Sequence, residues 1–359
     1  MEGRPISGLF DGVIGHGAVI DLLTREMRQP TQTYLFVGPG STGKATVARR
    51  FAAGLLCPDG DPGCLRRVSA GNHPDLIDVE PDGQTSLTVD RARSTVARAS
   101  LSPVESDRKV FLFEEAGMMS DEAANALLKT LEEPTVSTIF ILVTESEDDL
   151  PATVASRSRT VFFGRVPDAE VVAALEARGI APEHAAHAAR TAGGRPGLAL
   201  MLATRPEVAA FRAAWLSVPR RLRSAPGDAF LLAESIIAAS EPLLAGIEER
   251  QDAEEHAASD GGAVKTLKER HERERRRATA ALHVTGLEIL ASWYRDAAAA
   301  QFGAEARNRD VPGADLVSVT PAAAVANADR VLLTIRSLEA NQRPDLALAS
   351  LFSDLATPA

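Results

Sequence analysis

The sequence contains few cysteines and few aromatic residues, and we expect no run of apolar residues that approaches the length of a membrane span. Two cysteines among 359 residues exclude the disulfide framework of a small secreted domain. Residues 1–5 lack the apolar core of a signal peptide, so we expect a cytoplasmic protein that makes no membrane contact. Aromatic residues make up only 4% of the chain, and alanine is abundant, which favours helix-rich packing in the second half.

Basic residues are also in the minority. The chain has 39 Lys and Arg against 49 Asp and Glu, a net charge of −10, which argues against nucleic-acid binding by bulk electrostatics. One local exception is the run from Lys265 to Arg277, with seven Lys or Arg and three Glu. It predicts a solvated helix face with i,i+4 ion pairs, and a DNA-facing or partner-facing surface is the alternative.

Short apolar runs alternate with helical patterns in the first 165 residues, which is typical of a parallel sheet with helices on both faces. We expect strands at 34–37, 76–79, 110–113, 139–143 and 161–163, and helices at 46–56, 90–99 and 121–131, the last with Ser120 as its N-cap. Beyond Pro167 the patterns are helical only, over 168–178, 182–190, 196–203 and then in longer stretches. The fold class predicted is therefore a P-loop α/β domain over 1–165, a small helical domain over 166–205 and an all-α domain over 206–359.

A glycine-rich run joins the first predicted strand to the first predicted helix: Gly38-Pro39-Gly40-Ser41-Thr42-Gly43-Lys44-Ala45. In a phosphate-binding loop, backbone N–H groups surround the phosphates, the lysine contacts their oxygens and a following Ser or Thr binds Mg²⁺. Gly38, Gly40, Gly43 and Lys44 are therefore candidate nucleotide-binding residues. Ala45 stands at the metal position and Thr46 comes one residue too late, so the loop permits ATP binding but lacks the hydroxyl ligand for Mg²⁺. The alternative is an inherited loop that has lost its chemistry.

Two acidic residues, Glu114 and Glu115, follow the third predicted strand. Nucleoside triphosphatases with this loop place Asp-Glu there, where the Asp assists Mg²⁺ and the Glu polarises the attacking water. Glu114 keeps the charge but is one methylene longer than Asp, and Glu115 has the position of a vestigial catalytic base. Helix-dipole partners or solvated loop charges are the alternative interpretation.

Two further stretches closely resemble the clamp-loader subunits of bacterial DNA polymerase III, which belong to the AAA+ superfamily. They are Ala123-Ala124-Asn125-Ala126-Leu127-Leu128-Lys129-Thr130-Leu131-Glu132-Glu133-Pro134 and Leu150-Pro151-Ala152-Thr153-Val154-Ala155-Ser156-Arg157-Ser158. The family has a Ser-Arg-Cys triplet, of which Ser158 replaces the cysteine. The resemblance implies that Arg157 is an arginine finger supplied in trans to a neighbouring subunit's nucleotide, and that Thr144 is at the sensor-1 position. A structural salt bridge is the alternative for Arg157.

The resemblance extends along most of the chain. Gly15-His16 is similar to the family's entry motif, and residues 193–200 are similar to the start of its sensor-2 helix. Gly197 is in register with the sensor-2 arginine of the motor subunits and cannot replace it, whereas Arg195 is a candidate substitute. Residues 338–348 are similar to the end of the collar domain in delta-prime subunits.

Cys57 and Cys64 lie where clamp-loader subunits often carry a four-cysteine zinc module, just before the segment 71–75, which contains His73. A closed tetrahedral zinc site needs four ligands, and this chain offers two cysteines. His73 belongs to the flanking motif. Zinc is therefore unlikely, and we expect a degenerated loop with reduced, packed cysteines.

The resemblance, together with the losses at Ala45, Glu114 and Gly197, implies a stator subunit of the delta-prime type, with little or no ATPase activity of its own, in a DNA-directed DNA polymerase (nucleotidyltransferase) holoenzyme. Its partners would be the gamma/tau and delta subunits, the sliding β clamp and, through the complex, primer–template DNA. A gamma/tau-like subunit with its own weak ATPase is one alternative. A P-loop kinase or nucleotide switch unrelated to clamp loaders is another.

Overall fold

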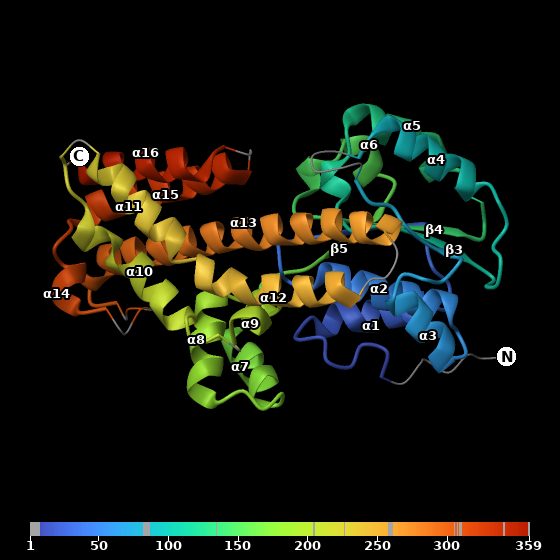
Figure 1. Cartoon of the computed structure of the whole chain (residues 1–359), viewed down its shortest axis with the longest axis horizontal. Coiled ribbons are helices and arrows are strands. Elements are labelled where there is room, and N and C mark those ends of the chain that lie inside the picture. Colours follow the sequence, from blue (N-terminus) through green and yellow to red (C-terminus); the bar gives the residue numbers. More distant parts are fainter. Residues whose placement is uncertain are drawn as a thin grey trace. The chain divides into compact units, whose positions relative to one another are not determined.

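The computed structural model describes residues 8–81, 87–133, 135–203, 205–225, 227–257, 261–304, 306, 308, 311–339 and 342–357. The chain divides into two compact units. One comprises Met1–Gly179 with Gly194–Ala199, and the other comprises Ile180–Gly193 with Leu200–Ala359. The first is an α/β unit and the second is helical (Figure 1). The three-part division predicted from the sequence stays a prediction.

A five-stranded parallel sheet forms the centre of the first unit. Its strands are β1 (Thr33–Val37), β2 (Leu76–Asp78), β3 (Lys109–Phe113), β4 (Thr138–Thr144) and β5 (Arg159–Phe162), in the order β2-β3-β4-β1-β5. Val37 at the end of β1 lies opposite Thr144 on one side and Phe162 on the other. The order therefore places the glycine-rich loop, which follows β1, between the carboxyl ends of β4 and β5.

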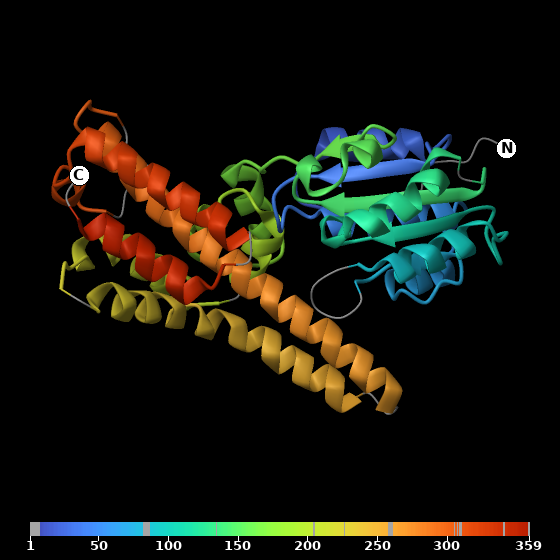
Figure 2. The ribbon, with the colours of Figure 1, turned by 90° about the horizontal axis from the view of Figure 1, so that it is seen from above.

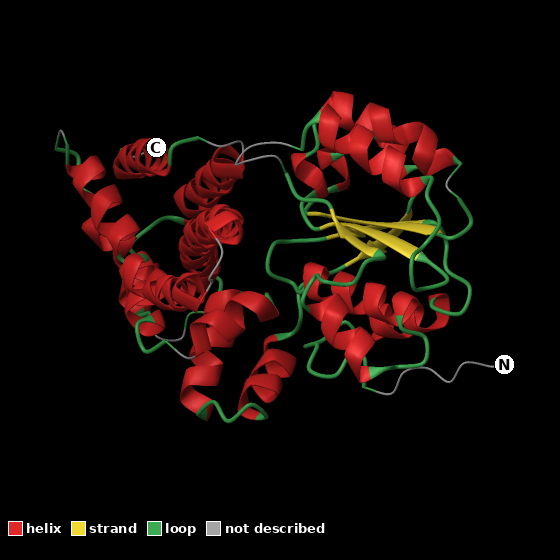
Figure 3. Cartoon of the chain, turned by 45° about the vertical axis from the view of Figure 1, so that its right-hand side comes forward, coloured by secondary structure: helices red, strands yellow, loops and turns green. Residues whose placement is uncertain are grey.

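Helices cover both faces of this sheet (Figure 3). On one face lie α1 (Gly17–Glu26), α2 (Lys44–Leu56) and α3 (Pro62–Ser69), and on the other lie α4 (Val89–Ala99), α5 (Asp121–Glu132) and α6 (Ala152–Ala155). Successive strand residues alternate between the two cores: Tyr34 and Phe36 enter the first, and Leu35 and Val37 the second. Burial on both faces explains why each strand is a continuous apolar run.

The predicted strands and helices of this unit are confirmed, with ends shifted by one or two residues in most cases. Ser120 caps α5 as predicted, because its hydroxyl accepts a hydrogen bond from the N–H of Ala123 at 3.2 Å. The sequence interpretation missed α1 and α3. Helix α3 begins after Asp61, whose carboxylate accepts a 2.6 Å hydrogen bond from the N–H of Cys64. The segment expected to be a degenerated loop is therefore partly an ordered, capped helix.

Two more helices follow the sheet: α7 (Asp168–Glu176) belongs to the first unit, and α9 (Pro196–Ala203) crosses the division. The second unit contains α8 (Pro182–Ala192), α10 (Val208–Arg221), α11 (Asp228–Ala238), α12 (Glu241–Ala257), α13 (Gly261–Ala300), α14 (Gly313–Leu316), α15 (Pro321–Glu339) and α16 (Pro344–Ala356). Helices α12 and α13 run side by side (Figure 2). Trp215 and Trp293 are fully buried, and the ring of Trp215 lies against Gly286, where any larger residue would overlap it.

The basic run of α13 is only partly a solvated face. Arg276 and Glu272 form the predicted type of i,i+4 ion pair at 3.1 Å. His271 and Arg273 are buried, however, and the amide of Gln251 in α12 donates to the His271 carbonyl at 3.1 Å. Part of the run therefore packs against α12. Most side chains of its first six residues lie outside the described residues.

One stretch, Asp228–Glu249, has the length and mean hydropathy (1.6) of a membrane span. The expectation that no apolar stretch approaches this length was therefore wrong. The criterion is length and composition only, and a core helix of a soluble protein also meets it. In the structure the stretch is divided between two helices, α11 and α12, and the face of α11 that carries Leu232 and Ile236 is buried.

Candidate functional site

The glycine-rich loop keeps the backbone shape of a phosphate-binding loop. Gly38 has φ 153°, and a Cβ there would lie 2.1 Å from the Phe163 carbonyl oxygen, so no larger residue fits. Gly43 has φ 98°, in the left-handed region, and is the N-cap of α2. A Cβ at Gly40 would lie 2.7 Å from a carboxylate oxygen of Glu145. The predicted loop glycines are thus required by close approach or by backbone conformation.

Lys44 is buried in this loop with 6% of its surface exposed. Its Nζ donates to the carbonyl oxygens of Gly38 at 2.5 Å and Pro39 at 2.7 Å. Burial lowers the pKa of Lys44, and the negative charges of Glu145 and Asp149 oppose this effect. The ammonium group that would contact phosphate oxygens is therefore bound to the carbonyls of its own loop.

The hydroxyl groups near the loop either form hydrogen bonds within the chain or lie away from the position that would bind a metal. Thr42 donates to the Pro39 carbonyl at 2.9 Å, and Thr46 is exposed, one residue and about 100° round the helix from Ala45. Thr144 lies at the end of β4, opposite Val37, which precedes the loop, and its sensor-1 role stays a prediction. Its hydroxyl donates to Asp149 at 2.5 Å.

The carboxylate of Glu114, at the end of β3, is bound to an arginine that the sequence interpretation did not single out. Arg49 of α2 donates to Glu114 Oε1 from Nη2 at 2.8 Å and from Nε at 3.2 Å. The same guanidinium donates to both carboxylate oxygens of Asp78, at the end of β2, at 3.0 Å each. Burial lowers the pKa of Arg49, but the hydrogen bonds and charges of Asp78 and Glu114 outweigh it and raise the pKa overall.

These residues do not fit a Mg²⁺ ion. Mg²⁺ requires oxygen ligands at about 2.0–2.1 Å in octahedral geometry. The loop offers the methyl group of Ala45 instead of a hydroxyl, and Glu114 accepts two N–H bonds from Arg49. Glu115, the predicted vestigial base, is half-buried where the short 3-10 helix η1 (Ala116–Met118) begins, and its role stays a prediction.

Two segments from elsewhere in the first unit contact the loop. His16 Nε2 lies 2.9 Å from the Thr42 carbonyl oxygen. The N–H of Gly197 donates to the Ser41 carbonyl at 2.9 Å, and a Cβ at position 197 would lie 2.9 Å from the same oxygen. Gly197 therefore permits this close approach in addition to lacking the sensor-2 side chain. Arg195, the candidate substitute, is 4% exposed.

Arg157 lies in the turn between the end of α6 and the start of β5. Its guanidinium pairs with Glu132 of α5 at 2.6 Å and donates to the Thr153 carbonyl at 2.9 Å. Both side chains of the pair are partly exposed, 37% for Arg157 and 44% for Glu132. Ser158, the replacement for the family's cysteine, donates to the Val154 carbonyl at 2.8 Å and closes the turn. The salt-bridge alternative thus has an identified partner, Glu132.

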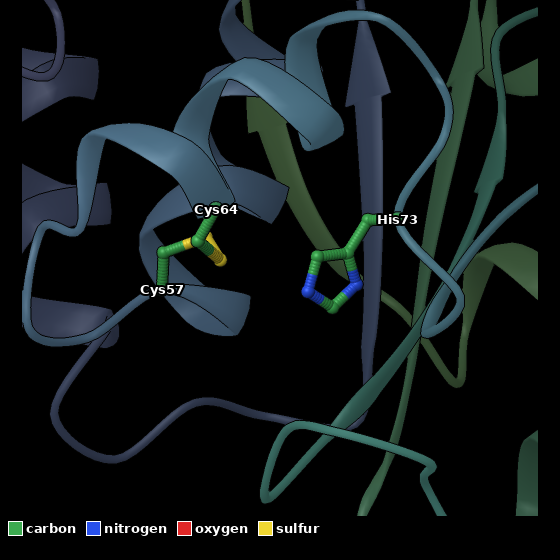
Figure 4. A group of neighbouring side chains, drawn as sticks. All are labelled: Cys57, Cys64 and His73. Atoms are coloured by element: carbon green, nitrogen blue, oxygen red, sulfur yellow. A yellow bond between two sulfur atoms is a disulfide. The ribbon is translucent and has the colours of Figure 1, made fainter.

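Cys57 and Cys64 form a disulfide, so the expectation that they are reduced was wrong. Helix α3 brings Cys64 back to the end of α2, with the two Cα atoms 5.9 Å apart, which suits a disulfide. A ring nitrogen of buried His73 lies within 4.8 Å of both sulfurs, and Figure 4 shows this ring beside the bond. His73 Nδ1 accepts from the Asp75 N–H at 3.2 Å, and burial lowers its pKa. Disulfide sulfurs do not bind zinc as thiolates do, and zinc stays untested.

The strand, glycine-rich loop and helix, in a parallel sheet flanked by helices, define a P-loop α/β domain. Residues 15–167 match the family model described as "DNA polymerase III, delta subunit". Over this region the chain is similar to both the delta' and the tau/gamma subunits of DNA polymerase III.

Similarity to individual relatives is confined to part of the chain. It is 37% identical over 141 residues to the delta' subunit of Bacillus subtilis, covering 37% of this chain and 42% of that protein. The tau subunit of Bacillus subtilis is 31% identical over 172 residues, covering 45% and 30%. The delta' subunit of Pseudomonas aeruginosa is 36% identical over 137 residues, covering 36% and 42%. The chain thus spans less than half the length of each of these relatives.

Two solved structures from Thermotoga maritima also align with the chain. RuvB has a TM-score of 0.42 and 16% identity, covering 68% of this chain and 91% of that one. A DNA polymerase III gamma-subunit-related protein has a TM-score of 0.38 and 14% identity, covering 94% and 99%.

Proposed function

We propose that this chain is the delta-prime, or stator, subunit of a DNA polymerase III clamp loader. It would assist ATP-dependent loading of the sliding β clamp onto primed DNA and would present Arg157 to the nucleotide of a neighbouring subunit. One observation carries this proposal: the methyl group of Ala45 replaces the metal-binding hydroxyl of the loop and Glu114 is bound to Arg49, whereas Arg157 is exposed and held by one surface ion pair and a hydrogen bond to the Thr153 carbonyl.

The energies support this assignment of roles. An exposed ion pair contributes about 0–1 kcal/mol, so Arg157 can leave Glu132 at little cost when a phosphate is offered. A guanidinium stabilises the charge that develops on the transferred phosphoryl group, and a bidentate contact to phosphate is stronger than the surface pair that it replaces. The proposed partners are the gamma/tau and delta subunits, the β clamp and, through the complex, primer–template DNA, in the cytoplasm.

The test is DNA-stimulated ATP hydrolysis by the clamp loader reconstituted with this full chain and its companion subunits. Arg157→Ala should leave assembly intact and lower turnover at the affected site by about 10³-fold or more. Arg159→Ala is a matched control, because Arg159 is also partly exposed and forms a single ion pair, with Glu26 at 3.0 Å. Equal turnover in the two variants would reject the role of Arg157.

A gamma/tau-like subunit with its own weak ATPase is the second candidate, favoured by the 31% identity to a tau subunit over 172 residues. The two candidates differ in the isolated chain. A stator should show no ATP turnover above background. Turnover that disappears in Lys44→Ala would establish the gamma/tau-like alternative.

A further inference from the structure

One nitrogen atom of Arg49 lies directly between two carboxylates from different strands. Nη2 donates to Asp78 Oδ1 at 3.0 Å and to Glu114 Oε1 at 2.8 Å. These strands, β2 and β3, are neighbours in the sheet, so their carboxyl ends place both carboxylates on the same edge. The remaining donors complete the arrangement, Nη1 to Asp78 and Nε to Glu114.

The carboxylates of Asp78 and Glu114 contact the same nitrogen atom, so their negative charges lie close together and repel each other. A positive charge between them removes this repulsion. In a site built for a divalent ion, the metal supplies that charge. Here the guanidinium does so permanently, because arginine stays protonated at any physiological pH. Its N–H···O distances of 2.8–3.2 Å are those of hydrogen bonds and leave no room for an ion between the same oxygens.

The loop itself points in the same direction. Ala45 removes the hydroxyl ligand from the loop without replacing the charge of a metal ion. Arg49 brings a positive charge to the carboxylates of Asp78 and Glu114.

We propose that the Arg49 guanidinium is a built-in cation that takes the place of a divalent metal between Asp78 and Glu114, so that this chain excludes Mg²⁺ and any phosphate ligand of its loop binds without metal. The inference rests on the proposed function in one respect, since a stator has no need of a hydrolytic metal. Arg49 would then prevent metal binding, which is an effect that a purely structural ion pair would not have.

The experiment is a titration of the full chain with Mn²⁺ alone, followed by electron paramagnetic resonance of the free ion. Wild type should take up no stoichiometric Mn²⁺ at this site. Arg49→Gln, which removes the charge and shortens the side chain but keeps it polar, should bind one Mn²⁺ about tenfold or more tightly than wild type, because the two carboxylates lose their counter-charge. Adding Glu114→Gln to Arg49→Gln should abolish that binding, and Arg49→Lys, which restores the charge, should again exclude the ion.

Two results would overturn the inference. One is a stoichiometric Mn²⁺ bound by wild type and lost in Glu114→Gln. The other is a folded Arg49→Gln that binds no Mn²⁺. The wild-type titration decides by itself if the Arg49 variants do not fold. Because this measurement uses the isolated chain and metal only, it can fail while the Arg157 test on the complex succeeds, and the reverse also holds.

Discussion

Two arginines in the first unit, Arg49 and Arg157, are held in opposite ways. Arg49 makes four hydrogen bonds to two carboxylates and its side chain is 26% exposed. Arg157 pairs with one carboxylate, Glu132, and is 37% exposed on a short turn. The modest difference in exposure matters less than the number and rigidity of the partners. A guanidinium fixed by two strands belongs to the structure, whereas one held by a surface pair is available to a ligand.

The largest stability effect expected from this comparison is at Arg49. Arg49→Ala should lower the free energy of unfolding by about 3 kcal/mol, because Asp78 and Glu114 lose a shared, partly buried counter-charge. Arg157→Ala should lower it by only about 1 kcal/mol or less. Urea unfolding of the two variants at neutral pH measures both values. Equal losses would remove the distinction on which the comparison rests.

Helix α2, which carries Arg49, is linked at its C-terminal end to α3 by the Cys57–Cys64 disulfide, with a sequence separation of 7. By the loop-closure argument, reduction should lower the free energy of unfolding by about 2–3 kcal/mol. Unfolding of wild type with and without dithiothreitol measures this, and the Cys57→Ala, Cys64→Ala double variant should show no response to the reductant. Thiol titration of the folded protein that finds two free thiols would contradict the disulfide.

Asp75 differs from Asp78 in the groups that bind its carboxylate, which are backbone N–H groups instead of the Arg49 side chain. Buried Asp75 accepts from the N–H groups of Val104, Glu105 and Ser106 at 2.6–2.8 Å. Burial raises the pKa of Asp75, but these hydrogen bonds outweigh it and hold the pKa below the usual value of an aspartate. A lowered folded-state pKa means stability that is present above the unfolded-state pKa and lost as the pH falls through the folded-state value. Asp75→Asn should therefore cost about 2 kcal/mol at pH 7 and less below pH 4.

The measurement is urea unfolding of wild type and Asp75→Asn between pH 7 and pH 3. Asp345→Asn serves as the control, because Asp345 is held by the exposed Arg343 side chain and should show a much smaller change. A cost for Asp75→Asn that stays the same across this pH range would mean that the carboxylate charge is not what the three N–H groups stabilise.

The smallest effect should come from releasing Arg157. Glu132→Gln removes its ion-pair partner and should change the free energy of unfolding by less than about 1 kcal/mol. If the ion pair with Glu132 only holds Arg157 while no nucleotide is bound, DNA-stimulated ATP turnover of the reconstituted complex should be retained or raised. Turnover that falls as far as in Arg157→Ala would show that Glu132 positions the finger, and the comparison with Arg49 would then need revision.

The order of elements in the first unit was predictable because apolar runs and helical periodicity are local signals. The phosphate-loop shape was predictable for the same reason, since Gly38 and Gly43 are needed where the backbone itself is constrained. Helix α3 escaped prediction because it is short, with only Val68 fully buried, so its apolar pattern is slight. Nothing in the interpretation therefore brought Cys64 back to the end of α2, where Cys57 lies.

The partners of Glu114 could not be read from the chain in the same way. Arg49 is 29 residues from Asp78 and 65 from Glu114 in the sequence. Many other pairs of acidic and basic residues have similar separations, so the spacing does not identify this one. Their meeting depends on β2 and β3 being neighbours and on α2 covering the face of the sheet beside them. A basic residue on the helix after a phosphate loop, with acids at two strand ends, was the only signal available.

The sequence by itself determined the alternation of strands and helices, the glycine-rich loop and the missing metal hydroxyl at Ala45, because each depends on neighbours along the chain. Only the tertiary structure decided that Arg49 bridges Asp78 and Glu114, that Gly197 contacts the loop and that Cys57 is bonded to Cys64. Those facts depend on strand order and helix placement, which bring distant residues within hydrogen-bonding distance and which no local pattern encodes.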